Sequence, residues 1–138
     1  MKERCGRLKC DVLIALDFDD TLVHTDRSED FSVLSRLREL GVELCIASRN
    51  DNYYLERQLR DLEIREHFRF IMADFRPKSI QLRHILWLYG KLDCLFTKIL
   101  FVDDHLPNIE RVREELPNVS CYQFGQDIVQ LSQMIDLV

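Results

Sequence analysis

The sequence contains little glycine and little proline, with 4 glycines and 3 prolines in 138 residues. This composition argues against a long linker, a disordered tail or a fibrous repeat. Hydrophobic residues make up 46% of the chain and charged residues 31%, as in an ordinary globular protein. The length suits one domain, which buries roughly two-thirds of its unfolded surface and needs no disulfides to form a core.

A long hydrophobic run is also absent. The first apolar stretch, Val12–Leu16, ends at Asp17 and is too short for a signal-peptide core or a membrane span. The cysteines are odd in number and include no pair at zinc-binding spacing, which indicates structural thiols in a reducing compartment. We therefore expect a cytoplasmic protein. The five cysteines are Cys5, Cys10, Cys45, Cys94 and Cys121.

Basic residues are outnumbered by acidic ones, with 19 Lys and Arg against 24 Asp and Glu and a net charge of −5. Residues 1–10 nevertheless carry four basic side chains and one acidic side chain. We expect a basic N-terminal segment at 1–10, flexible or ordered, followed by a single domain at 11–138. The overall balance disfavours nucleic acid as a partner without excluding it, because a local basic pocket for an anionic substrate is still allowed.

Short apolar runs alternate with helical patterns along the chain, and each run is typical of a buried strand. Strict alternation forces parallel pairing, so we predict a doubly wound, Rossmann-like α/β domain with about five parallel strands and helices on both faces. The same pattern places Trp87 in the core. The expected strands are 12–16, 42–47, 70–73, 99–102 and 119–124. The expected helices are 30–40, one capped by Asn50 or Asp51, one opened by Pro77, 107–116, and a closing helix with Ile128, Leu131, Met134 and Ile135.

Polar residues follow the ends of these predicted strands. The carboxyl ends of parallel strands meet at one edge of a sheet, where ligands bind near the point at which strand order reverses. We therefore expect these side chains to gather in one site. They are Asp17 and Asp19 after the first strand, Ser48 and Arg49 after the second, Lys78 a few residues after the third, and Asp103 and Asp104 after the fourth.

A cluster of carboxylates repels itself unless a cation compensates it. Oxygen ligands without His or Cys suit Mg²⁺, and a metal together with a lysine attracts phosphate. Asp17 is placed to act as a nucleophile, because carboxylates form aspartyl-phosphates. Asp19 is placed to protonate the leaving oxygen, provided that its acidic neighbours raise its pKa. Glycine-rich dinucleotide and Walker-type motifs do not occur, which disfavours those nucleotide sites.

The sequence resembles the haloacid dehalogenase-like (HAD) phosphatases in four successive motifs. The segment DFDDT, which begins at Asp17, is similar to the DxDxT signature of that family. Ser48 resembles the hydroxyl residue of the second motif, Lys78 the lysine of the third, and Asp103-Asp104 the acidic pair of the fourth. The surrounding phrases IASR and FVDDHLPNI are most similar to the small magnesium-dependent phosphatases of the superfamily. The resemblance covers most of the chain.

This resemblance implies a role for each matched residue. Asp17 would be the nucleophile and a magnesium ligand, and Asp19 the acid/base that also lends its backbone carbonyl to the metal. Ser48 would donate its hydroxyl and its backbone N–H to the phosphoryl oxygens. Lys78 would bridge the nucleophile and the phosphoryl group. The second acidic position is usually the direct ligand in the family, which favours Asp104.

Three more residues complete the candidate site. The resemblance implies that Thr21 holds the turn after the nucleophile and that Asn108 contacts the water shell of the metal. Arg49 would grip a phosphate or a carboxylate of the substrate, although pairing at the surface is nearly as good an interpretation. Asp103 is kept beside Asp104 among the candidate magnesium ligands, because the sequence alone does not decide which of the two binds the metal directly.

The sequence thus predicts a Mg²⁺-dependent phosphomonoester hydrolase that works through an aspartyl-phosphate. Only 26 residues separate Thr21 from Ser48 and 29 separate Ser48 from Lys78, which leaves no room for a cap domain. We expect an open site that favours a phosphorylated protein or other large molecule, or a lid from a second subunit. The alternative is a HAD-fold binding or regulatory module without turnover. A receiver domain of a two-component system is excluded by the order of its residues. Its acidic pair would follow the first strand, whereas the pair Asp103-Asp104 follows the fourth.

Overall fold

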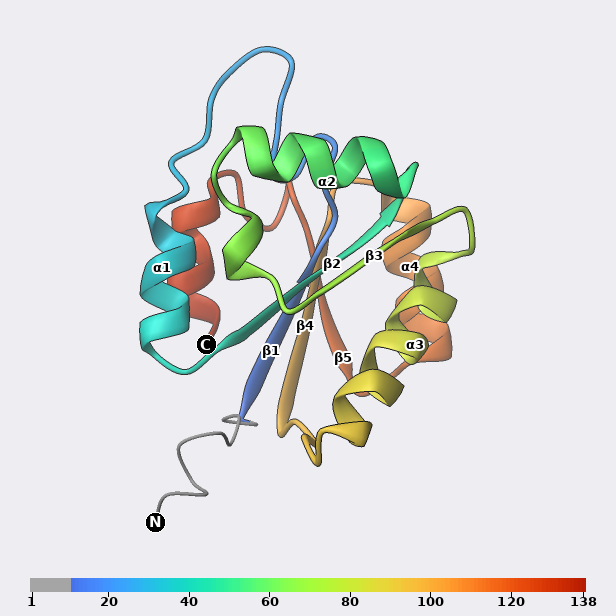
Figure 1. The fold of residues 1–138 in the computed structure, drawn as a ribbon. Coiled ribbons are helices and arrows are strands. Elements are labelled where there is room, and N and C mark those ends of the chain that lie inside the picture. Colours follow the sequence, from blue (N-terminus) through green and yellow to red (C-terminus); the bar gives the residue numbers. More distant parts are fainter. Residues whose placement is uncertain (1–10) are drawn as a thin grey trace.

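The structure, a computed structural model, describes residues 11–138, so the basic segment predicted at 1–10 lies outside the described residues. Figure 1 shows one parallel sheet between two layers of helices. The strands are β1 (Val12–Leu16), β2 (Glu43–Arg49), β3 (Phe70–Asp74), β4 (Lys98–Asp103) and β5 (Val119–Gln123). The helices are α1 (Ser32–Glu39), α2 (Asn52–Asp61), α3 (Lys78–Lys91) and α4 (Leu106–Glu115), with short 3₁₀ helices η2 (Arg65–His67) and η3 (Leu131–Leu137).

The order of the strands, β3-β2-β1-β4-β5, puts β1 at the centre of the sheet. Ala15 of β1 pairs with Cys45 of β2 on one side and with Phe101 of β4 on the other. The chain therefore winds in one direction from β1 to β3 and in the other from β4 to β5. The gap between the carboxyl ends of β1 and β4 is the switch point at which sheets of this kind bind ligands.

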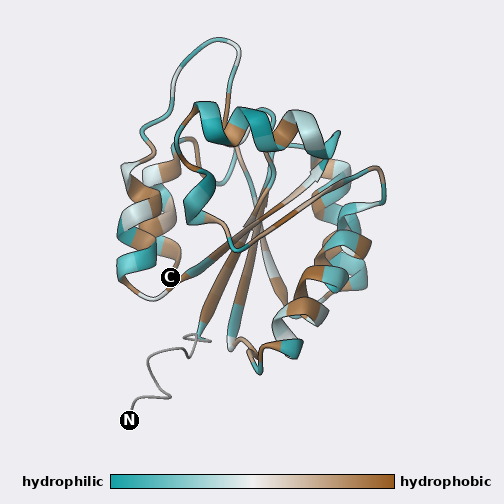
Figure 2. Ribbon diagram, in the orientation of Figure 1, coloured by the Kyte–Doolittle hydropathy of each residue, from teal (hydrophilic) through white to brown (hydrophobic). Residues whose placement is uncertain are grey.

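Alternate residues of the strands feed two separate cores. Ile14 and Leu16 of β1 pack on the side of α1, α2 and η3, whereas Leu13 and Ala15 pack on the side of α3 and α4. Both faces of the central strands are covered, which explains why their sequences are apolar without interruption. Figure 2 shows this as brown strands between helices that are part brown and part teal.

The predicted fold class is confirmed, including the absence of a cap domain between the strands of the described chain. Two details were wrong. The closing element is the 3₁₀ helix η3, and Ile128 lies before it in a bridge with Phe124. Trp87 is 58% exposed, because the side of α3 that faces the sheet is filled by other residues.

The cysteines agree only in part with the prediction of structural thiols. Cys45 and Cys121 are buried free thiols, whereas Cys94 is disulfide-bonded. Burial raises the pKa of the Cys121 thiol to about 11, so this group packs as a small apolar side chain. Within the described residues, no helix is long and apolar enough to span a membrane.

Candidate active site

A tight turn after β1 sets the directions of the first acidic residues. The N–H groups of Leu22 and Val23 both donate to the carbonyl of Phe18, whose side chain is buried in the core. Asp20 adopts a left-handed backbone with φ of 61°, which Asp tolerates better than most residues. Asp17 is held at the end of β1 by a hydrogen bond from its N–H to the carbonyl of Val102 (3.0 Å). The turn thus buries Asp17 and leaves Asp20 in solvent.

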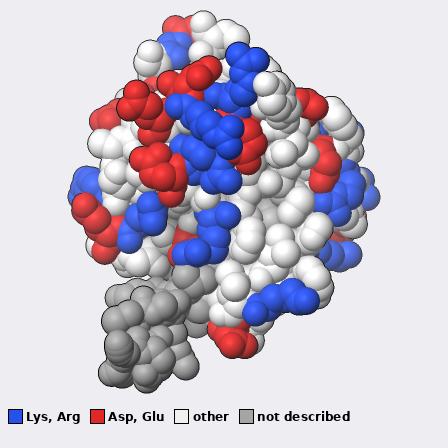
Figure 3. Space-filling view, in the orientation of Figure 1, with Lys and Arg blue, Asp and Glu red and all other residues white. Residues whose placement is uncertain are grey.

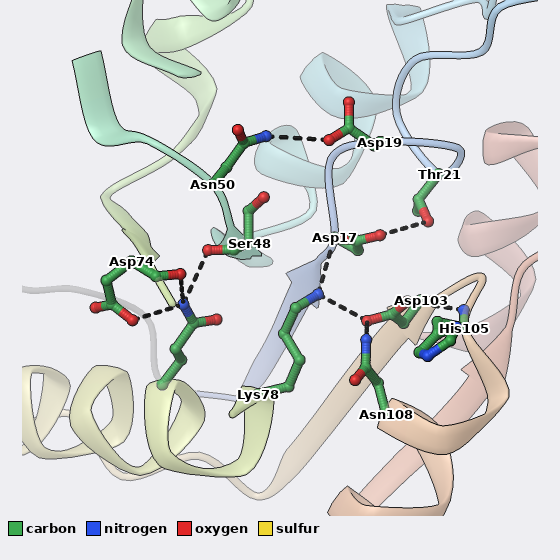
Figure 4. Close-up of polar contacts among 11 residues, drawn as sticks. Asp17, Asp19, Thr21, Ser48, Asn50, Asp74, Lys78, Asp103, His105 and Asn108 are labelled. Atoms are coloured by element: carbon green, nitrogen blue, oxygen red, sulfur yellow. Dashed lines mark hydrogen bonds and ion pairs between the residues drawn. The ribbon is translucent and has the colours of Figure 1, made fainter. Parts of the chain in front are cut away.

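Lys78 is the first residue of α3 and reaches from this helix into the gap between β1 and β4. Its side chain is only 3% exposed. The Nζ donates to Oδ1 of Asp17 at 2.8 Å and to Oδ2 of Asp103 at 2.7 Å, as Figure 4 shows. A buried ammonium needs such partners because losing water is costly for a charge. Three segments of the sequence therefore meet in one buried ionic group.

Asp103 is fully buried at the end of β4, and three donors hold its carboxylate. Besides Lys78, Oδ2 accepts from Nδ2 of Asn108 at 3.1 Å, and Oδ1 accepts from the N–H of His105 at 2.9 Å. Asn108 thus lies beside the acidic pair. Its contact with a hydrated metal stays a prediction.

The carboxylates of Asp17, Asp103 and Asp104 form a compact acidic group. One oxygen atom from each lies within 4.8 Å of the others. Lys78 supplies a single positive charge against these three negative charges. The donor set consists of oxygen atoms alone, which Mg²⁺ prefers, and the excess of negative charge suits a divalent cation. The residues present therefore fit a magnesium ion.

The electrostatics of the group reflect its burial. Burial raises the pKa of Asp17 well above its ordinary value, Lys78 opposes this shift, and the charge of Asp103 adds to it. Burial also raises the pKa of Asp104, while a hydrogen bond with Asp17 lowers it. Both carboxyl groups are thus short of positive charge in the protein alone. A second cation would stabilise their ionised forms.

Asp19 lies apart from this group and faces solvent. Its Oδ2 accepts a hydrogen bond from Nδ2 of Asn50 at 3.0 Å, as Figure 4 shows. Partial burial and the neighbouring charge of Asp20 raise the pKa of Asp19, while the bond from Asn50 lowers it. The upward direction is the one that an acid role requires, although burial contributes more than the acidic neighbour.

Asn50 was considered from the sequence only as a helix cap. The cap of α2 is Asp51, whose carboxylate accepts from the N–H of Tyr54 at 2.9 Å. Asn50 is therefore free to turn toward Asp19. Its position two residues after Ser48, at the edge shared with Asp19, was the available signal.

Ser48 lies buried at the end of β2, beside Asp17 in Figure 4. Its carbonyl accepts from Nε2 of Gln81 at 2.8 Å, and the same amide donates to Oδ1 of Asp74 at 3.0 Å. Gln81 was not predicted from the sequence to belong to the site. Its spacing of three residues from Lys78 puts both side chains on one side of α3, which could have revealed it.

Thr21 and Arg49 complete the predicted set. The hydroxyl of Thr21 donates to Oδ2 of Asp17 at 3.5 Å, so it lies on the turn as expected. Arg49 is exposed and pairs in register with Asp74 of β3. The Asp74 carboxylate is bound by Arg76 at 2.7 Å instead, which holds the pKa of Asp74 at about 2. Arg49 is the last residue of β2, and its contact with a phosphate stays a prediction.

Comparisons with known proteins identify no matching family model and no matching curated protein. Solved structures do match. The N-terminal part of a Bacteroides fragilis protein, which contains a phosphatase domain and was solved with Mg, aligns at 18% identity and a TM-score of 0.67. It covers 89% of this chain, but the chain spans only 38% of that structure.

Two further solved structures match this chain with lower TM-scores. The HAD domain of the effector protein Lem4 from Legionella pneumophila is 16% identical with a TM-score of 0.61, over 86% of this chain and 88% of that one. The 3-deoxy-D-manno-octulosonate 8-phosphate phosphatase of Moraxella catarrhalis, solved with magnesium, phosphate and its sugar, is 22% identical with a TM-score of 0.51. That match covers 83% of this chain and 69% of the other. At such identities the likeness concerns the fold: the chain has the fold of the HAD phosphatase domains.

Proposed function

We propose that this protein is a Mg²⁺-dependent phosphomonoester hydrolase that works through a phosphorylated Asp17. The observation that carries the proposal is the buried ionic group at the switch point of the sheet. There Lys78 lies within 2.8 Å of Asp17 and 2.7 Å of Asp103, with Asp104 alongside. Structures with the same fold include phosphatases solved with magnesium, which supports the proposal.

The residues divide the reaction between them. An oxygen of Asp17 attacks phosphorus while the bond from phosphorus to the leaving oxygen breaks, and Asp19 gives its proton to that oxygen. Asp19 then takes a proton from a water molecule, whose oxygen attacks the phosphorus of the aspartyl-phosphate and releases phosphate and Asp17. Lys78 offsets negative charge on the phosphoryl oxygens, and Ser48 donates to one of them.

A magnesium ion would be held by Asp17, Asp104 and Asp103 and by the backbone carbonyl of Asp19. When bound, it offsets the charge of both the carboxylates and the phosphoryl group. Asn108 would orient its water ligands from its place beside Asp103. The substrate is a phosphomonoester, and we propose that its phosphate is carried by a protein or another large molecule.

The test compares substitutions of two residues, Asp17 and Asp20, in the turn that follows β1. Phosphate release is measured with Mg²⁺ on sugar phosphates, nucleotides, phosphopeptides, 3′-phosphorylated oligonucleotides and p-nitrophenyl phosphate. Asp17→Asn is nearly isosteric but cannot attack phosphorus, so its activity should fall more than about 1,000-fold. Asp20→Asn, in the exposed left-handed position of the same turn, should keep its activity within about threefold.

A second readout addresses the intermediate directly. Rapid acid quenching should trap a phosphoryl group on the peptide that contains Asp17, and the group should be absent from Asp17→Asn. Activity of Asp17→Asn above a few per cent of wild type would rule out the covalent mechanism. If the protein binds Mg²⁺ but turns over none of the substrates, the alternative of a non-catalytic HAD-fold module is correct.

A further inference from the structure

The helix α3 differs from every other helix of residues 11–138 in having no acidic residue. Its charged side chains are Lys78, Arg83 and Lys91, in a protein whose net charge is −5. Lys78 is buried in the ionic group, so Arg83 and Lys91 are the cations that α3 presents to solvent. A helix of this composition gives the molecule a local positive surface.

The outer side of the same helix is also unusually apolar. The inner side is filled by Leu82, Ile85 and Tyr89, which are completely buried. A surface helix normally carries polar residues opposite such a stripe, yet Trp87 projects outward and is 58% exposed. Figure 3 shows a largely white surface over α3, with blue groups at its margins.

The turn after α3 extends this apolar surface. Leu92 is 47% exposed and Leu95 is 80% exposed. With Trp87 they make three exposed large apolar side chains within nine residues of the sequence, a higher density than the single scattered apolar residues of an ordinary surface. We define the α3 outer face as Arg83, Trp87, Lys91, Leu92 and Leu95.

Neither cation of this face forms an ion pair with a carboxylate in the described part of the chain. The carboxyl of Glu115 lies near Arg83, but its pKa is lowered mainly by the hydrogen bonds from Ser79 and Arg111 and only in smaller part by the charge of Arg83. The Nζ of Lys91 lies 4.6 Å from the centre of the Trp87 ring. Arg83 donates to the main-chain carbonyl of Glu115 at 3.3 Å. Of the acids that flank α3 in sequence, Asp74 is paired with Arg76, and Asp93 follows the helix by two residues. Within residues 83–95 the two cations outnumber Asp93, the single acid of that span, so the face has an excess of positive charge.

We propose that the α3 outer face binds an acidic, amphipathic segment of a protein partner. Leucine or phenylalanine side chains of the segment would pack on Trp87, Leu92 and Leu95, and its carboxylates would pair with Arg83 and Lys91. Tryptophan and arginine are the residues that most often dominate such contacts. Trp87, near the middle of the face, lies about 14 Å along the helix from Lys78, at 1.5 Å per residue, and the proposed binding does not depend on the proposed phosphatase activity.

Other occupants suit the face less well. A nucleic acid binds through many phosphate contacts, and two cations are few for that purpose, while Leu92 and Leu95 offer bases nothing to stack on. A second copy of this chain, in a symmetric contact, would bring the same positive face against itself. An acidic protein segment satisfies both the charge and the apolar area.

The experiment starts from a random-peptide display library selected against the immobilised full chain. Enriched peptides should combine Asp or Glu with large apolar residues. A labelled enriched peptide should bind with a saturable change in anisotropy. Binding should also shift the tryptophan emission to shorter wavelength, because the peptide would exclude water from the indole ring. The signal belongs to Trp87, which is the single tryptophan of the chain. Trp87→Ala and Lys91→Glu should each weaken binding at least tenfold, as measured by anisotropy.

The matched control lies on another helix. Tyr53 of α2 is 71% exposed and Arg57 lies 5.8 Å from its ring centre, so Tyr53→Ala removes a similar exposed aromatic–cation pair and should leave binding unchanged. The proposal is overturned if enriched peptides lack acidic residues or bind Lys91→Glu as well as wild type. It is equally overturned if single-stranded oligo(dT) binds this face more tightly, or if the protein forms a dimer that Trp87→Ala disrupts.

Discussion

Asp17 and Asp19 are two residues apart in the sequence, yet they lie in different surroundings. Asp17 is buried against Lys78, whereas Asp19 is exposed and is bonded by the neutral amide of Asn50. Two carboxyl groups in contrasting environments are suited to two different tasks. Burial raises the pKa of Asp17 against the opposing charge of Lys78, so the ionised form that attacks needs the further cation that the acidic group is suited to bind. The raised pKa of Asp19 suits a group that must carry a proton.

The assignment of Asp19 as the acid predicts a dependence on the leaving group. Asp19→Asn cannot give a proton, so hydrolysis of alkyl phosphates, whose leaving oxygen needs one, should slow by about 100-fold to 10,000-fold. Hydrolysis of p-nitrophenyl phosphate, whose leaving group departs unprotonated, should slow far less. Steady-state kcat on both substrates makes the comparison, with Asp20→Asn as the control. Equal losses on both substrates would contradict the acid role.

The two acids of the fourth motif should differ in their effect on magnesium. All three hydrogen bonds to the Asp103 carboxylate come from protein donors, two of them to Oδ2, whereas Asp104 is half-exposed. Asp104 therefore has more lone pairs available for an ion. Asp104→Ala should weaken Mg²⁺ binding, measured by calorimetric titration, by about tenfold or more. Asp103→Ala should weaken it less, and the opposite ranking would make Asp103 the principal ligand.

At the scale of residues, the sequence predicted those side chains whose placement follows from the end of a strand. Asp17 and Asp103 meet because β1 and β4 end at one edge of the sheet, and a strand end can be read from an apolar run. Lys78 joins them from the first residue of α3, a few residues after β3 ends. Asn50 and Gln81 were not predicted, because their partners, Asp19 and the carbonyl of Ser48, come from distant segments. Which of several amides in a loop or helix faces such a partner depends on packing.

At the scale of elements, α3 connects two parts of the candidate site. Its first residue, Lys78, binds Asp17, and one turn later Gln81 binds the carbonyl of Ser48 at the end of β2. The rigid helix therefore fixes the distance between Asp17, the proposed nucleophile, and the segment proposed to bind phosphate. Gln81 is a positioning residue in this arrangement, since it touches neither the nucleophile nor the acidic group.

Replacement of Gln81 should therefore weaken phosphate binding without removing any group that contacts phosphate. Gln81→Met keeps the size of the side chain but loses both N–H donors and leaves the carbonyl of Ser48 unpaired. The inhibition constant of inorganic phosphate should rise about tenfold, and the free energy of unfolding should fall by about 1–3 kcal/mol. Competitive inhibition and denaturant unfolding measure the two quantities, while Mg²⁺ binding should be unchanged.

Ser79 offers a control on the same helix. It is buried like Gln81, and its hydroxyl donates to Glu115 at 2.7 Å, on the side away from Ser48. Ser79→Ala should lower stability without changing phosphate inhibition. If both variants changed the inhibition constant alike, Gln81 would have only a structural role.

The elements themselves were largely predictable, and their errors have physical reasons. The strand β1 was predicted with its observed bounds because a fully buried strand is apolar at every position. Trp87 was assigned to the core because α3 is apolar on several sides, and periodicity cannot tell which side meets the sheet. The closing segment was expected to be α-helical, but a run of seven residues after an isolated bridge forms the 3₁₀ helix η3.

At the scale of the molecule, the strand order explains why four short motifs spread over the chain form one site. Reversal of the winding direction between β1 and β4 brings Asp17 beside Asp103, although 85 residues lie between them. The alternation of strands and helices indicated a doubly wound sheet. It did not determine the order of the strands, which depends on how the helices pack across the two faces.

The connections between the strands predict the size of the substrate. The chain between β1 and β2 contains a loop and α1, and the chain between β2 and β3 contains α2 and η2, so neither of these two connections holds a separate domain that could cover the site. Without a cover, few protein groups contact the remote parts of a small substrate, and its binding gains little from them. KM for free sugar phosphates and nucleotides should therefore be about 1 mM or higher, and KM for a phosphorylated protein should be lower.

Steady-state kinetics on both classes, with the oligomeric state measured by light scattering, test this expectation. A low-micromolar KM for a small sugar phosphate, shown by a monomeric protein, would contradict it, whereas the same value from a dimer would indicate that a second subunit supplies the cover.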